Sequence, residues 1–133
     1  MLRIIATLGT VGRLTYLMKM SMLENVIQAH HERNRELLRL IANKGADPSV
    51  PCAIDLHFWA TNEENARGLS AALEARGYSP VSTNRAVADL SLWNVETHVQ
   101  ASPFSVASPA FVVDLVQLAC AHGGEFDGWG TSI

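Results

Sequence analysis

Residues 123–133, GGEFDGWGTSI, are the stretch on which the fold prediction depends. They set Phe126 and Trp129 among four glycines next to an acidic pair. A segment of this kind could be a ligand loop, a metal-binding turn or a strand. The rest of the chain decides between these, because a strand here needs other strands to pair with.

Composition limits the classes of function. The chain has 133 residues, which suits one domain, and its 48% hydrophobic and 17% charged residues are typical of a packed fold. The net charge is −3 and no Lys or Arg run occurs, so we expect no direct contact with nucleic acid. Cys52 and Cys120 lack Cys-x-x-Cys spacing. This favours a reducing, cytoplasmic setting, with no disulfide, metal or cofactor.

The first 20 residues are apolar but are interrupted by Arg3 and Arg13. A membrane-spanning helix needs roughly 20 consecutive apolar residues, and no convincing signal-peptide cleavage site follows. We therefore expect residues 1–20 to be a flexible arm or an over-extended translation start without a membrane role, with a signal peptide as the alternative.

A leading helix is expected over residues 21–45. Ser21 and Glu24 form a capping box, and Gly45 followed by Pro48 ends the segment. Its middle, HHERNRE (residues 30–36), is expected to be a solvated face, with a partner surface as the alternative.

Two further helices are marked by their ends. One begins at Thr61, with Glu64 completing a capping box, and stops at Gly77. The other has Ser108 as N-cap and Pro109 in its first turn, and it stops at Gly123.

Two stretches alternate apolar and polar residues, as strands with one buried face do. Residues 53–60 (AIDLHFWA) direct Ile54, Leu56 and Phe58 to one face, and residues 90–101 (LSLWNVETHVQA) repeat the pattern. Residues 78–85 predict a weaker strand, which Pro80 confines to a sheet edge.

The order of these segments predicts an α+β fold. It is a ferredoxin-like β-α-β-β-α-β core over residues 52–133 with an extra N-terminal helix, so that residues 21–133 form a single domain. Residues 125–133 are then the fourth strand, beside the first. The structural motif Phe126, Gly128, Trp129 and Gly130 places both glycines on alternate positions with Phe126, and we expect its two aromatic rings to complete the core.

Three stretches together resemble the regulator of ribonuclease E activity B (RraB) family. GGEFDGWGT is similar to the family's terminal signature, with Phe126 where a Tyr is usual. LLRLIANKGADP followed by AIDLHFWA is similar to its leading helix and first strand, and ALEARGYSP is similar to the next helix and turn. The resemblance covers about residues 35–133.

The resemblance implies a non-catalytic bacterial protein that binds ribonuclease E, inhibits it and so alters RNA turnover. The expected partner is therefore a protein, and the expected state is a monomer or weak homodimer.

The polar face of the central strands carries the candidate site residues. Asp55, His57 and Trp59 lie on one strand, and Glu96 and His98 lie on the other. We take these five residues as candidate partner contacts. The alternative is a small metal-dependent or acid–base enzyme, because imidazole and carboxylate groups on paired strands could converge. A third interpretation is a polar face that is solvated, or covered by the leading helix with Trp59 and Trp129 packed underneath, and structural polar clusters often imitate sites in this way.

Overall fold

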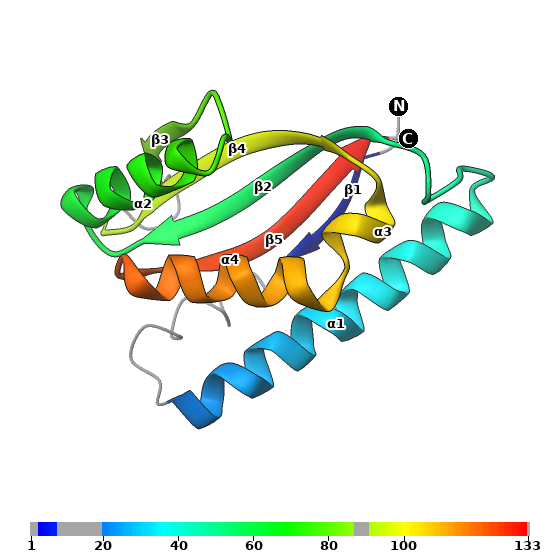
Figure 1. The fold of residues 1–133 in the computed structure, drawn as a ribbon, viewed down its shortest axis with the longest axis horizontal. Helices are drawn as coiled ribbons and strands as arrows, with labels where there is room; N and C mark the ends of the chain where they lie inside the picture. The colour runs from blue at the N-terminus through cyan, green and yellow to red at the C-terminus, as the bar shows by residue number, and fades with distance from the viewer. Residues whose placement is uncertain (1–2, 8–19, 87–90, 133) are drawn as a thin grey trace.

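The computed structural model describes residues 3–7, 20–86 and 91–132, and in them helices cover one face of a five-stranded sheet (Figure 1). The strands are β1 (Arg3–Thr7), β2 (Cys52–Ala60), β3 (Ser82–Arg85), β4 (Trp93–Ala101) and β5 (Gly124–Ser132). The helices are α1 (Met20–Asn43), α2 (Glu63–Ala75), α3 (Pro103–Val106) and α4 (Pro109–Ala121).

The sheet confirms the predicted α+β class. Its order is β1-β5-β2-β4-β3, and every neighbouring pair is antiparallel. Within it, β2-α2-β3-β4-α4-β5 follows the split β-α-β connectivity expected from the sequence, with β2 and β4 central and β3 at an edge. The closing stretch is therefore a strand, and it pairs with β2 along nearly its whole length.

The strand β1 extends this core on the other side of β5. Arg3 pairs with Ser132 and Thr7 pairs with Gly128, so β5 has a neighbour on both edges. The arm expected over residues 1–20 included no strand. Residues 8–19, which make up most of that arm, lie outside the described residues.

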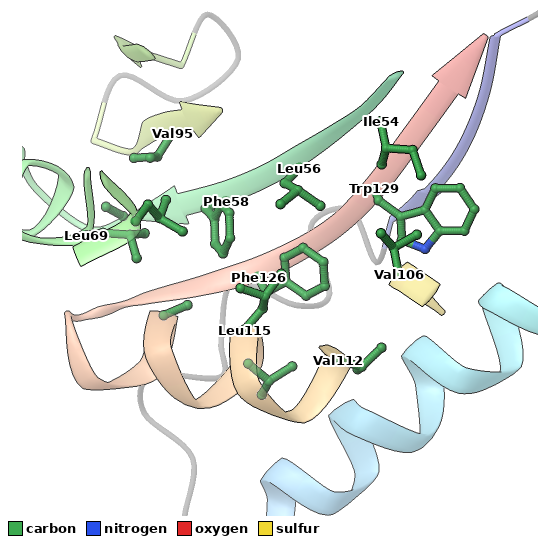
Figure 2. Packing of buried hydrophobic residues seen from close by; sticks show 14 of the residues in the cluster. Ile54, Leu56, Phe58, Leu69, Val95, Val106, Val112, Leu115, Phe126 and Trp129 are labelled. Atoms are coloured by element: carbon green, nitrogen blue, oxygen red, sulfur yellow. The ribbon is translucent and has the colours of Figure 1, made fainter. Parts of the chain in front are cut away.

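The hydrophobic core lies between the sheet and the helices. The predicted inward residues of β2 are fully buried and meet Leu115 of α4 and Leu69 of α2, as Figure 2 shows. Phe126 of β5 packs against Phe58, with ring centroids 5.1 Å apart. Aromatic rings of this size contribute much of the buried apolar area of a small domain.

A bulge in β5 corrects the predicted facing of the closing motif. His57 pairs with Gly128 but Phe58 pairs with Phe126, so Asp127 is an extra residue in the ladder. Gly128 has a φ of 130°, which a residue with a side chain rarely adopts. As a result Trp129 returns to the core face beside Leu56, whereas the glycines at 128 and 130 face the other way.

The helix ends are close to those predicted. Ser108 is the N-cap of α4, as expected. The N-cap of α2, however, is Asn62 rather than Thr61, because the Asn62 side chain accepts a hydrogen bond from the Asn65 amide at 2.8 Å. The Thr61 hydroxyl instead donates to the Gly123 carbonyl at 3.1 Å, which ties the start of α2 to the start of β5.

Candidate functional site

The polar sheet face brings four of the five predicted site residues together. Asp55 lies directly opposite His98, and His57 lies directly opposite Glu96. All four side chains point away from the core, because Leu56 and Thr97, between them on each strand, are buried. The alternation read from the sequence is therefore correct on both central strands.

These residues form two separate histidine–carboxylate pairs. Nδ1 of His57 lies 3.0 Å from Oε1 of Glu96, and Nδ1 of His98 lies 2.6 Å from Oδ1 of Asp55. Because a carboxylate accepts, each histidine donates from Nδ1. Acid and imidazole alternate along each strand as well as across the two strands.

Within each pair, one side chain is more exposed to solvent than the other. The His98 and Glu96 side chains are about half exposed, at 55% and 46%, whereas Asp55 and His57 are at 23% and 20%. The exposed members lie on β4 and the covered members on β2, in the middle of the sheet. A partner that approaches this face would therefore meet Glu96 and His98 first.

Trp59 belongs to the same face but not to the pairs. It lies opposite Asn94 on one side and Glu125 on the other, and it is half-buried. Farther along β5, Gly128 lies opposite His57 and Gly130 lies opposite Asp55. The alternative in which Trp129 packs under this face is wrong, because its ring completes the core, as expected for the closing strand.

The chemistry available to this face is limited. Among the residues that the structure describes, no three or more His, Cys, Asp or Glu side chains are grouped to hold a metal ion. His57 has the orientation of a base held by a carboxylate, since Glu96 binds Nδ1 and leaves Nε2. That Nε2 is buried and has no hydrogen-bond partner within the described part of the chain.

A second polar pair, His30 and Asn34, was missed by the sequence-based prediction. The expected solvated face of α1 instead turns both side chains inward, and they are 1% and 2% exposed. Nε2 of His30 donates to the Phe126 carbonyl at 3.1 Å, and its ring stacks on Phe126 at 5.1 Å between centroids. Nε1 of Trp129 donates to Oδ1 of Asn34 at 2.9 Å.

Burial sets the protonation state of His30. Removal from water lowers its pKa from 6.5 to about 4, more than the hydrogen bond to Phe126 raises it, and the nearby His31 lowers it further. His30 is therefore neutral near pH 7. His30 and Asn34 each form a polar contact between α1 and the closing motif.

The sequence contains a spacing pattern that predicts the burial of His30 and Asn34, although both residue types are polar. The residues that α1 turns toward the core follow alternating steps of four and three: Leu23, Ile27, His30, Asn34, Leu37 and Ile41. This is the spacing of a helix stripe that packs on a core. Spacing alone would have placed His30 and Asn34 inside.

The chain matches a known protein family. Residues 31–131 match the model of a family described as Regulator of ribonuclease activity B. The match begins within α1, next to His30, and ends at Thr131 near the end of β5. No curated protein matches the chain.

Proposed function

Because the chain belongs to the regulator of ribonuclease activity B family, we propose that it is a non-catalytic, cytoplasmic regulator that binds an endoribonuclease of the ribonuclease E type and inhibits it by direct contact. The observation that carries this proposal is the extent of the match. It takes in β2, β3, β4, β5 as far as Thr131 and the C-terminal half of α1, so it leaves out only β1 among the paired strands of the described residues.

The polar sheet face supports a role in contact rather than in chemistry. Its histidines and carboxylates already bond to one another in pairs. An enzyme would need these groups to be directed at a substrate, with a pKa suited to proton transfer. A partner needs a shaped, polar surface, which Trp59, Glu96 and His98 offer together with the more covered Asp55 and His57.

Membrane attachment is not needed for this role. None of the helices in the described residues is long and apolar enough to cross a bilayer. A partner reached by diffusion suits the cytoplasmic setting expected from the two cysteines, which are free and half-buried.

One observation favours a second candidate function, acid–base catalysis by His57. Glu96 orients its ring as a carboxylate orients a catalytic base, and Nε2 remains to take a proton. The burial of that Nε2 argues against it, because a base must reach the proton it abstracts. We therefore favour the regulatory function over acid–base catalysis.

The test is an RNA cleavage assay with a purified ribonuclease E-type enzyme. Increasing amounts of the protein are added to enzyme and a labelled RNA, and complex formation is measured in parallel by light scattering. We expect cleavage to slow as a complex forms, and we expect the protein alone to leave the RNA intact. Unchanged cleavage and no complex at a large excess of protein would overturn the proposal.

A further inference from the structure

The end of the molecule formed by the C-terminal half of α1, the loop after it and α3 displays large apolar side chains. Leu40, Val50 and Phe104 are 41%, 54% and 52% exposed. They come from these three segments, which lie at one end of the domain in Figure 1. A hydrogen bond of 3.0 Å from the Phe104 amide to the Pro48 carbonyl joins α3 to the loop.

Cations surround Leu40 in the sequence and are exposed. Arg35 and Arg39 lie on α1, and Lys44 follows it. None of the three side chains makes an ion pair or hydrogen bond with any residue that the structure describes. By contrast, Arg67 binds Glu63 at 2.6 Å and Arg76 binds Asp114.

Two acidic side chains nearby have partners within the chain. Glu36 lies 3.8 Å from Arg33, and Asp47 accepts two hydrogen bonds from Ser49. Those bonds lower the pKa of Asp47. Asp47 therefore stays ionised, whereas Arg35, Arg39 and Lys44 carry positive charge that no ion pair within the described residues offsets.

We infer that this basic, apolar end is a second docking surface, and that its occupant is an acidic polypeptide segment with large apolar side chains. The inference rests on the proposed function, because it names the kind of partner segment that a contact regulator would hold here. Carboxylates would meet Arg35, Arg39 and Lys44, while Leu or Phe side chains would cover Leu40, Val50 and Phe104.

The chemistry favours a peptide over RNA. Single-stranded RNA binds where cations accompany aromatic rings on which bases stack. Two of the three exposed apolar residues here, Leu40 and Val50, are aliphatic and offer no stacking surface. Exposed apolar residues among unpaired cations are better matched by an acidic, apolar chain.

The test uses three fluorescent probes and the full chain. One is a synthetic peptide rich in Asp, Glu, Leu and Phe, the second is its Asn and Gln counterpart, and the third is an oligouridylate of similar length. Fluorescence anisotropy gives Kd for the wild type and for Arg39→Glu with Lys44→Glu, Phe104→Ser and the control Arg67→Glu. Circular dichroism checks that each variant is folded.

We expect the acidic peptide to bind at least about tenfold more tightly than its amide counterpart, with an affinity that falls as salt rises. The double charge reversal and Phe104→Ser should each raise Kd by about tenfold or more. Arg67→Glu should leave Kd unchanged. No binding by the wild type, an equal Kd for the charge-reversed variant, or tighter binding of the oligouridylate would overturn the inference.

A second copy of the chain is the remaining occupant to test. Self-association that Phe104→Ser abolishes and that the acidic peptide does not displace would also overturn the inference. The cleavage assay separates this result from the proposed function. If the wild type and the charge-reversed variant inhibit the ribonuclease equally, this surface fails and the regulator stands. If the peptide binds as expected but the wild type does not inhibit, the regulator fails and the surface stands.

Discussion

His30 on α1 and His57 on β2 each bind an oxygen acceptor, but on opposite faces of the same sheet. His30 donates to the Phe126 carbonyl in the core, where it is 1% exposed. His57 pairs with a carboxylate, Glu96, on the face that no described helix covers. The first arrangement makes a neutral imidazole part of the packing, and the second keeps a charged cluster at the surface. Polar residues at expected helix surfaces can therefore hold the fold, while the histidine–carboxylate cluster that resembles an active site lies on the opposite face of the sheet.

The largest loss of stability is expected when β5 is removed, because this strand contributes to both faces of the sheet. It carries Phe126 and Trp129 on the core face and lies beside Asp55 and His57 on the other. A chain that ends at Gly124 should be unfolded or aggregated, because it loses buried rings from a domain with a total stability of about 5–15 kcal/mol. Circular dichroism and size-exclusion chromatography measure this. A cooperative thermal transition in the truncated chain would contradict it.

Substitution of Trp129 and of Trp59 compares how much a tryptophan ring on each face of the sheet stabilises the fold. Trp129→Ala should cost about 3–5 kcal/mol in free energy of unfolding, because its ring is fully buried. The control, Trp59→Ala, changes the same residue type on the half-buried polar face and should cost clearly less. Urea denaturation measures both. Equal losses would show that the two faces are packed alike.

The pH dependence of stability tests the buried state of His30. Its pKa is lowered from 6.5 to about 4 in the fold, so the unfolded chain binds a proton more readily. His30 should therefore lower stability as pH falls through the window from about 6.5 to about 4, and the loss should approach about 3 kcal/mol. Above about pH 6.5 it should cause no change.

The variant His30→Gln keeps a donor but cannot titrate in this window. Its free energy of unfolding should change less than that of the wild type between pH 6.5 and pH 4. If His30→Gln and the wild type lose stability in parallel, His30 is not the group responsible.

A double-mutant cycle tests the other half of the buried pair. Asn34→Ala and Trp129→Phe each remove one end of the 2.9 Å hydrogen bond. Their coupling energy should be about 1 kcal/mol, the usual net value of such a bond. Additive losses in urea denaturation would mean that the bond contributes nothing.

The smallest effect is expected for the surface pairs. His57→Ala with His98→Ala should lower the free energy of unfolding by about 1 kcal/mol or less, since exposed ion pairs contribute little. The control is His30→Ala, which removes one buried ring. A loss from the double variant that exceeds the loss from His30→Ala would show that the polar face holds the fold.

Local patterns in the sequence predict most of this fold. The alternation around Leu56 and Val95 identifies the central strands and their faces, and helix signals such as Ser108 identify the helices. The bulge at Asp127 escaped prediction because one extra residue reverses every later facing on the strand. The pairing of β1 with β5 joins the two ends of the described chain, and no local sequence pattern predicts it.

The candidate site could be predicted in part. The register that sets Asp55 against His98 and His57 against Glu96 follows from pairing the two alternating strands. His30 and Asn34 were assigned to solvent because their polarity outweighed their spacing. Their partners, a carbonyl and an indole on β5, exist only once the distant strand is in place.

The most direct test of the account compares maximal inhibition of a ribonuclease E-type enzyme by the wild type and by His57→Ala with His98→Ala. A contact regulator should inhibit to the same extent in both forms once the enzyme is saturated, even if the variant needs a higher concentration. Loss of maximal inhibition by a variant that still forms the complex, with RNA or small-molecule turnover by the wild type alone, would contradict the account and assign chemistry to the histidines.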